Sequence, residues 1–336
     1  MVENNPLISI IVPVYNIAGR IPALIESLKC QSYENLEIII YDDASADTNK
    51  GAYFKGLSLE QSFASVKILR GEINRGVSYA RNRGIEAAAG KYLIFIDGDD
   101  FVDENIILKL YNALVSSGAD YASCGYKTLE LMGGVERGHP LRVSAGLTKD
   151  QVLAGRIRNA YEISHIASLF NRDFLLKNAV SFTEGCTAGE DMEFILKFLC
   201  HGRGVFIPDC LYTYVYHDGM GSRKNVIDKQ KKYSRYSDHT YAQIRQTAYV
   251  AKNAPGKISL RLARDMLWPS ACQRILSLCA MRGDRERYEK LLRAPRMRKN
   301  LLSAWRSLFY KPEVFLRSCF ALYAPGLYWK KYARYL

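Results

Sequence analysis

The chain has 336 residues, more than one typical domain, and its 48% of hydrophobic and 12% of aromatic residues exclude a largely disordered protein. Its formal net charge of +13 is unevenly distributed, because residues 223–336 hold 26 Lys and Arg against 7 Asp and Glu, whereas residues 1–222 hold 21 against 27. This asymmetry predicts an acidic part with fixed carboxylates and a basic part that meets an anionic partner. Charge alone does not distinguish nucleic acid, anionic lipid and polyphosphate.

The sequence shows neither a signal peptide nor a membrane-spanning segment. Residues 1–6 are acidic and polar and lead directly into a strand pattern, unlike a signal peptide. No window reaches the ~18–20 apolar residues that a spanning helix needs. We therefore expect a cytoplasmic protein that does not cross a membrane.

The first 126 residues alternate between buried-strand and amphipathic-helix patterns. Strands are expected at residues 7–14, 36–41, 65–69, 92–96 and 119–126, and helices at residues 21–28, 77–89 and 106–114. Such alternation predicts an α/β fold, with a mostly parallel sheet covered by helices on both faces.

The remaining residues are patterned less regularly. Residues 127–147 are Gly-rich and are expected to form a surface loop, followed by a helix at 190–201 and a short strand at 211–216. From about residue 225 the pattern is helical and basic. We therefore expect a first domain of residues 1–222, divided into 1–126 and 127–222, and a basic helical extension of residues 223–336.

Polar residues collect where the predicted parallel strands end. Tyr15 and Asn16 follow the first strand, Asp42 and Asp43 end the second, and an acidic turn begins at Asp97. Ligands of such sheets bind outside the carboxyl ends of the strands. These residues therefore indicate a site as well as a fold.

The acidic turn consists of Asp97, Gly98, Asp99 and Asp100. Three carboxylates this close repel one another, and a divalent cation such as Mn²⁺ or Mg²⁺ would remove that repulsion. The alternative is a solvated acidic helix start, because acidic side chains favour the positive end of the helix that follows. The position directly after a buried strand favours the metal.

Four segments of the sequence resemble, in order, those of the family 2 glycosyltransferases with the GT-A fold. They are residues 10–16 (IIVPVYN), 41–45 (YDDAS), 74–84 (NRGVSYARNRG) and 95–100 (FIDGDD). A weaker fifth match joins residues 182–185 (FTEG) to residues 190–194 (EDMEF). The resemblance covers about residues 7–222 and implies that residues 1–126 bind a nucleotide sugar and 127–222 form the acceptor side.

The resemblance also implies roles for residues at the first two strand ends. Pro13 and Tyr15 would cradle the nucleotide base, with Tyr15 stacking on it. Asp43 would accept a hydrogen bond from the base edge, and Asp42 would support the same loop. Pro13 could instead simply end its strand.

Three further residues are implied on the phosphate side of the donor. Arg81 would help to hold the nucleotide, Asp97 would contact the ribose or a water on the metal, and Asp99 would bind the metal that bridges the diphosphate. Alternatively, Arg81 is a surface charge of its helix that pairs with Glu86. Asp100 could be only structural.

On the acceptor side, Asp191 resembles the general base of the family, and Glu190 would orient it or touch the acceptor. The alternative is an ordinary acidic helix start. His217 follows the last predicted strand and resembles an additional metal ligand of some GT-A enzymes. Residues 164–170 (SHIASLF) lack the Trp and the basic residue often found before this region in the family, so relatives do not indicate the acceptor.

The last 47 residues mix Lys and Arg with aromatic residues. Basic amphipathic helices with aromatic side chains suit an anionic membrane surface, so we expect peripheral attachment at the inner face of the cell membrane. The alternative is a helical subdomain that packs its aromatic residues internally. Because no nucleic-acid-binding module accompanies the charge, nucleic acid is not an expected partner.

The sequence is therefore interpreted as a metal-dependent glycosyltransferase that moves a sugar from a nucleotide diphosphate donor, expected to be a UDP-sugar, to a hydroxyl of a glycan or lipid-linked acceptor. The resemblance implies inversion at the anomeric carbon. One alternative is a nucleotidyltransferase acting on a sugar phosphate, but residues 14–20 lack its Gly-rich basic phosphate loop. The other is a non-catalytic protein that binds an anionic polymer, which would not require Asp97, Asp99 and Asp191 together.

Overall fold

The computed structural model describes residues 5–46, 54, 59, 62–131, 134–216, 229–309 and 311–333. The chain divides into two compact units. The sheet unit comprises Met1–Gly146, Tyr161–Cys186 and His201–Lys224. The helical unit comprises Leu147–Ala160, Thr187–Cys200 and Asn225–Leu336, so it includes two segments from the first 222 residues.

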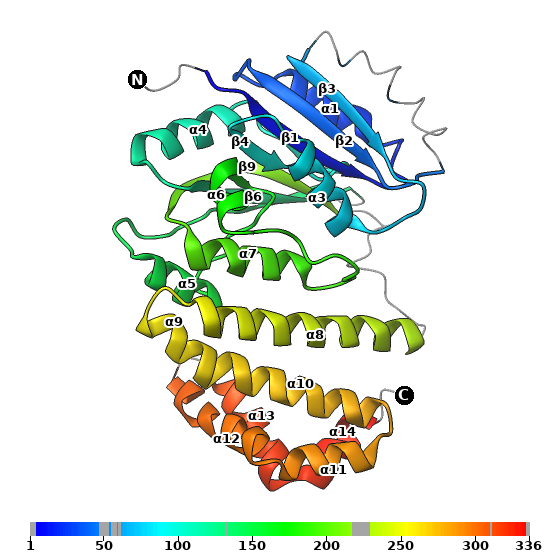
Figure 1. Ribbon diagram of the computed structural model, residues 1–336, viewed down its shortest axis with the longest axis vertical. Helices are drawn as coiled ribbons and strands as arrows, with labels where there is room; N and C mark the ends of the chain where they lie inside the picture. The colour runs from blue at the N-terminus through cyan, green and yellow to red at the C-terminus, as the bar shows by residue number, and fades with distance from the viewer. Residues whose placement is uncertain are drawn as a thin grey trace. The chain divides into compact units, whose positions relative to one another are not determined.

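The first half of the sheet consists of parallel strands. β1 (Ile8–Val14) pairs with β2 (Leu36–Asp42) and with β4 (Tyr92–Phe95), and β3 (Ser65–Arg70) pairs with β2, which gives the order β3-β2-β1-β4 (Figure 1). β1 and β2 are buried along their whole length, as expected for strands covered on both faces.

The second half of the sheet is mixed. β8 (Ser168–Asn171) joins β4 in the antiparallel direction, and β6 (Tyr121–Glu130), β9 (Gly204–Tyr216) and β5 (Phe101–Val102) continue the sheet beyond it. β9 is longer than the predicted strand at 211–216.

The prediction of a loop at residues 127–147 was wrong for residues 127–130 and 135–139. β6 continues to Glu130, and β7 (Val135–His139) returns along it as an antiparallel hairpin. All five residues of β7 are exposed, so the strand has no alternation of apolar and polar residues. Its backbone pairing with β6 holds it, and that pairing leaves no periodic signal in the sequence.

Helices cover both faces of the sheet, which confirms the predicted α/β architecture. On one face, Ile10 and Val12 of β1 share a hydrophobic core with α1 (Ile21–Lys29) and α4 (Ile106–Ser117). Ile11 points to the opposite face, where α3 (Val77–Ala87) packs so closely that a Cβ on Gly84 would lie 2.3 Å from Cγ2 of Ile11. The short α6 (Arg172–Lys177) follows β8.

The helical unit contains the predicted basic helices and two elements from earlier in the chain. Its elements are α5 (Lys149–Ile157), α7 (Glu190–His201), α8 (Lys229–Asn253), α9 (Lys257–Leu262), the π-helix η2 (Ala263–Leu267), α10 (Trp268–Met281), α11 (Arg285–Arg293), α12 (Pro295–Ser303), the 3₁₀-helix η3 (Ala304–Phe309), α13 (Pro312–Tyr323) and α14 (Pro325–Ala333).

Specific polar contacts bind these earlier elements to the helices that follow. The carboxylate of Asp150 in α5 accepts hydrogen bonds from the backbone N–H groups of Ile258 and Ser259 at 2.9 and 2.8 Å. Glu193 in α7 is buried and pairs with Arg245 of α8 at 3.0 Å. α5 and α7 are therefore integral parts of the helical unit.

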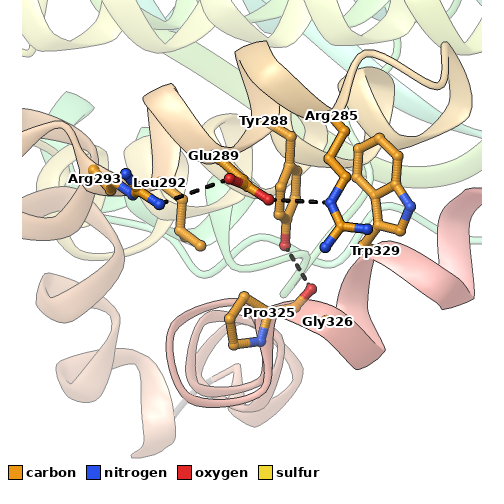
Figure 2. A pocket seen from close by; sticks show the side chains of 8 residues that line it. All are labelled: Arg285, Tyr288, Glu289, Leu292, Arg293, Pro325, Gly326 and Trp329. Carbon is orange, nitrogen blue, oxygen red and sulfur yellow. Dashed lines mark hydrogen bonds and ion pairs between the residues drawn. The ribbon is translucent and has the colours of Figure 1, made fainter.

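α11 and α14 enclose a cavity of about 290 Å³ (Figure 2). Tyr288 and Trp329 form its wall, with ring centroids 5.1 Å apart, and the Tyr288 hydroxyl donates to the carbonyl of Pro325 at 2.9 Å. Arg285 and Arg293 lie at its rim, on either side of Glu289. The cavity therefore combines an aromatic wall with a charged rim.

Among the helices that the structure describes, none is both long enough and apolar enough to span a membrane.

Candidate active site

Asp42 shapes the loop at the end of β2. Its side chain is fully buried, accepts a hydrogen bond from the backbone N–H of Ser45 at 2.9 Å and pairs with Arg70 at the end of β3. Arg70 also donates to the Ser45 carbonyl at 2.9 Å. Asp42 thus supports the loop that follows β2.

The end of β1 is fastened to the same loop. Asn16, at a left-handed φ of 52°, donates its backbone N–H to the Ser45 hydroxyl at 3.0 Å and accepts at its side-chain oxygen from Ala46 N–H at 2.8 Å. Pro13 is buried beside Tyr41 of β2. Tyr15 is 48% exposed, so its ring stands in solvent at a fixed strand end.

Asp43 connects the end of β2 to the start of α3. Its carboxylate accepts hydrogen bonds from the backbone N–H groups of Arg75, at 2.9 and 3.1 Å, and Gly76, at 2.7 Å. An ionised carboxylate offers about four acceptor positions. The hydrogen bond expected from a nucleotide base would therefore be accepted at a position that the backbone N–H groups of Arg75 and Gly76 do not occupy.

Arg81 lies on the buried side of α3. It is 3% exposed, and its Nη2 donates to Oδ1 of Asp97 at 2.7 Å. Glu86 pairs with Arg83 instead, at 2.5 Å, so Arg81 is not the surface partner of Glu86. The buried guanidinium places a fixed positive charge beside the acidic turn.

The three aspartates of the acidic turn have different environments. Asp100 is buried and accepts from the Tyr212 hydroxyl at 2.6 Å and from the Val215 N–H at 2.8 Å. Asp97 donates its backbone N–H to the same Tyr212 hydroxyl at 3.1 Å, and Asp99 is half-buried. Asp100 is therefore a structural anchor, while Asp97 and Asp99 remain at the surface of the turn.

The carboxylates of the turn are electrostatically crowded. Burial and the negative charges of Asp97 and Asp99 raise the pKa of Asp100 to about 8, against the opposing effect of the hydrogen bond from Tyr212. Gly98 keeps the turn close to β1, because a Cβ there would lie 2.6 Å from Ile17 and 3.2 Å from the Pro13 carbonyl. A cation at the turn would relieve the crowding.

Within the described residues, no group of three His, Cys, Asp or Glu side chains is arranged to hold a metal. The donor set at the turn is the pair of carboxylates on Asp97 and Asp99. Mg²⁺ in proteins is commonly bound through one or two carboxylates, with water and substrate phosphate completing its coordination. These two residues therefore fit a metal that arrives with a diphosphate; His217 lies outside the described residues.

Sequence reasoning missed a cationic cluster around Tyr79 of α3, formed by Arg75 just before the helix and Arg83 within it. The guanidinium of Arg75 lies 3.8 Å from the ring centroid of Tyr79, and Arg83 lies 4.9 Å from it on the same ring. Both arginines approach Glu184, at 3.8 and 3.5 Å. The four-residue spacing of Tyr79 and Arg83 within the helix is the signal that could have placed these two side chains on one face.

Asn82 fastens part of the weaker fifth motif to α3. Its amide nitrogen donates to the Phe182 carbonyl and the Glu184 carboxylate, both at 3.0 Å, and its oxygen accepts from the Phe182 N–H at 3.0 Å. Residues 182–184 are therefore held beside the helix that carries Arg81.

Glu190 and Asp191 begin α7 in the helical unit, and both are half-buried. The preceding Gly189 has a φ of 86° and packs closely on α8, because a Cβ there would lie 2.8 Å from Ala242. Its carbonyl accepts from Gln246 at 2.9 Å. The start of the helix is thus fixed within its own unit, and the roles of both acidic residues stay predictions.

Comparison with known proteins assigns the family. Residues 9–177, half of the chain, match the sequence profile of glycosyl transferase family 2. Glycosyltransferase GlyG of Streptococcus pneumoniae is 29% identical over 216 residues, which cover 62% of this chain and 70% of GlyG. The succinoglycan biosynthesis protein ExoO of Rhizobium meliloti is 27% identical over 236 residues, covering 68% and 66% of the two chains.

Solved structures share the fold. TarS of S. aureus, in complex with UDP-GlcNAc, superposes with a TM-score of 0.64 at 16% identity, over 95% of this chain and 92% of TarS. The mannosyltransferase PcManGT of Pyrobaculum calidifontis, in complex with GDP-Man and Mn²⁺, gives a TM-score of 0.54 at 15% identity, over 95% and 88%. The chain belongs to glycosyl transferase family 2 and is a glycosyltransferase with a GT-A-like fold.

We predict that Tyr212→Phe lowers the free energy of unfolding by about 1–3 kcal/mol, because the buried Asp100 carboxyl and the Asp97 N–H both lose a hydrogen-bond partner. Urea denaturation followed by circular dichroism measures the change. Tyr323→Phe is the control, since Tyr323 is 75% exposed and its substitution should change stability by less than about 0.5 kcal/mol. Equal stability of the two variants would contradict the anchoring role of Tyr212.

Proposed function

We propose that the enzyme transfers a sugar from a nucleotide diphosphate donor, specifically a UDP-sugar, to a hydroxyl of a glycan or lipid-linked glycan, with inversion at the anomeric carbon and dependence on Mn²⁺ or Mg²⁺. The observation that carries the proposal is the acidic turn. The buried Asp100 anchors the turn, and Arg81 places a buried positive charge beside it. Asp97 and Asp99 lie at the surface of the turn. TarS in complex with UDP-GlcNAc and PcManGT in complex with GDP-Man and Mn²⁺ support a donor of this class.

The base of the nucleotide would lie against the end of β1. The exposed ring of Tyr15 offers a stacking face, and Pro13 is buried two residues before it in β1. Asp43 would accept from the base edge, while Asp42 keeps the loop in shape through Ser45 and Arg70. Because these residues are tied to one another by backbone hydrogen bonds, the site needs little reorganisation on binding.

The diphosphate would lie over the acidic turn. Asp99 would bind the metal, and Asp97 would contact the ribose or a water on the metal while one of its oxygens accepts from Arg81. When bound, the divalent metal supplies positive charge that stabilises the diphosphate leaving group. Arg81 holds Asp97 in place and offsets part of the negative charge that the carboxylates bring together.

Asp191 would act as the general base. It would take the proton from the acceptor hydroxyl as the oxygen attacks the anomeric carbon and the bond from that carbon to the diphosphate breaks. A single displacement of this kind inverts the anomeric carbon and needs no covalent intermediate. Glu190 would orient the base or the acceptor. Both residues lie in the first turn of α7, where the positive end of the helix dipole attracts a carboxylate.

We predict that UDP binds more tightly with Mn²⁺ than with EDTA in isothermal titration calorimetry. Asp99→Asn should weaken binding in Mn²⁺ by more than the ~10–100-fold that loss of an outer-shell partner costs, because it removes a direct ligand. The control is Asp103→Asn, four residues away at the start of α4, where the carboxylate accepts from the backbone of Asn105. Equal UDP affinity in Mn²⁺ and EDTA would exclude the metal site.

We predict that Asp191→Asn lowers kcat about 10²–10⁴-fold and leaves the affinity for UDP unchanged, because the amide cannot accept the proton of the acceptor. Steady-state release of UDP and calorimetry measure the two quantities. Asp173→Asn is the control, since Asp173 is an exposed acidic residue in the first turn of α6. A parallel loss of UDP affinity in Asp191→Asn would remove Asp191 as the base.

Peripheral attachment to the inner face of the cell membrane is proposed for the helical unit. Six large apolar side chains between residues 302 and 327 are at least 43% exposed: Leu302, Trp305, Leu308, Leu316, Tyr323 and Leu327. Other aromatic side chains of the helical unit, such as Tyr328, pack in its hydrophobic core. Exposed apolar side chains among Lys and Arg suit an anionic lipid surface.

We predict that the triple variant Trp305→Ser, Leu316→Ser, Tyr323→Ser binds vesicles of phosphatidylcholine and phosphatidylglycerol at least about tenfold more weakly than the wild type, because it removes exposed apolar area. Vesicle sedimentation measures the bound fraction. The control is Ile73→Ser with Leu176→Ser, since those side chains are 69% and 50% exposed on the sheet unit. Equal binding of the triple variant and the wild type to the vesicles would contradict the proposed membrane attachment.

A further inference from the structure

The β6–β7 hairpin and the end of β9 line a cavity of about 190 Å³ in the sheet unit. The strand register places Tyr126 opposite His139 and Thr128 opposite Arg137, and Glu130 stands between Val135 and Tyr216. Paired residues of neighbouring strands point to the same face of a sheet, so these side chains gather on one face. The cavity is smaller than the about 300–1,000 Å³ of typical ligand pockets and suits a single ring.

One side of this cavity is formed by a stacked pair of rings. Tyr126 and His139 stack with centroids 4.8 Å apart and planes 19° apart. The Tyr126 hydroxyl donates to Glu162 at 2.8 Å, and the Thr128 hydroxyl lies 3.3 Å from Nε2 of His139. Both rings are thus held in place by the protein itself, which lowers the entropic cost of placing a ligand on them.

The chemistry around the rings matches that of a sugar. The faces of aromatic rings carry partial negative charge and attract the weakly positive C–H groups on one side of a pyranose. Thr128, Glu130 and Arg137 supply a hydroxyl, a carboxylate and a guanidinium at the rim, which can accept from or donate to sugar hydroxyls. An apolar ligand would form no hydrogen bonds with these polar groups.

The cavity is joined to the acidic turn by β9. The Tyr212 hydroxyl and the Val215 N–H both contact Asp100, and Tyr216, the next residue, lines the cavity. The strand register pairs Tyr126 with Tyr212, so the rings lie beside the strand that anchors the turn. None of the residues that line the cavity belongs to the acidic turn, so a sugar on the rings would occupy a place separate from the turn.

We propose that this cavity is an acceptor subsite, which holds a sugar ring of an oligosaccharide acceptor other than the ring whose hydroxyl is glycosylated. The proposal rests on the proposed function, and it adds that the acceptor is a glycan chain and not a monosaccharide. The exposed His139, with Tyr126 stacked on one of its faces, carries the contact with the sugar, and Thr128 and Arg137 select for hydroxyl positions.

The test uses the full chain with UDP and Mn²⁺. Saturation-transfer NMR measures the binding of oligosaccharides of one, two and four units built from glucose, galactose or N-acetylglucosamine. For at least one of the three series, affinity should rise with length in the wild type. His139→Ala should reduce the affinity for the four-unit ligand about three- to tenfold and leave that for the single sugar unchanged, because only the ring held in this cavity loses its stacking partner.

Lys127→Ala is the matched control, because Lys127 lies on the opposite face of the same hairpin and pairs with Glu136 at 3.1 Å. Lys127→Ala should show the same increase in affinity with oligosaccharide length as the wild type. The subsite is overturned if no series gains affinity with length in the wild type, or if the gain survives in His139→Ala. Calorimetry with UDP and Mn²⁺ reports on the donor site separately, so a failure of the proposed function is distinguished from a failure of the subsite.

Discussion

The hydrogen bonds that the buried Asp100 carboxyl accepts from the Tyr212 hydroxyl and the Val215 amide are the constraint on which the acidic turn depends. They fasten the turn after β4 to β9, a strand contributed from more than a hundred residues later. The Tyr212 hydroxyl also accepts from the backbone of Asp97, so one side chain fixes both ends of the turn. Asp97 and Asp99 owe their placement to this buried anchor.

The other parts of the site follow from the parallel half of the sheet. Because β1, β2 and β4 run in one direction, their carboxyl ends bring Tyr15, Asp43 and Asp97 to one edge. The α3 helix and the residues just before it then add contacts: the backbone N–H groups of Arg75 and Gly76 donate to the Asp43 carboxylate, and Arg81 of the helix donates to Asp97. This one segment thus contacts two of the strand ends that the donor would use.

Much of the sheet unit could be predicted from sequence, because β1 and β2 are continuous apolar runs and α1 buries Ile21, Leu24, Ile25 and Leu28 at helical spacing. The strand β7 could not, since its five exposed residues carry no pattern. The burial of Arg81 could not be predicted either. An Arg-rich helix start is expected to face solvent, and the sequence does not show that Asp97 lies beside Arg81. The hydrogen bonds of the Asp150 carboxylate, which join α5 to the start of α9, likewise leave no periodic signal in the sequence.

The central claim is that Asp99 binds a divalent metal that also contacts the diphosphate of the donor. Electron paramagnetic resonance of Mn²⁺ with the full chain and UDP tests it most directly, through the hyperfine coupling of the electron spin to phosphorus. We predict phosphorus coupling in the wild type and its loss in Asp99→Asn at the same concentrations of Mn²⁺ and UDP. Coupling that persists in Asp99→Asn, or is absent from the wild type, would contradict the account.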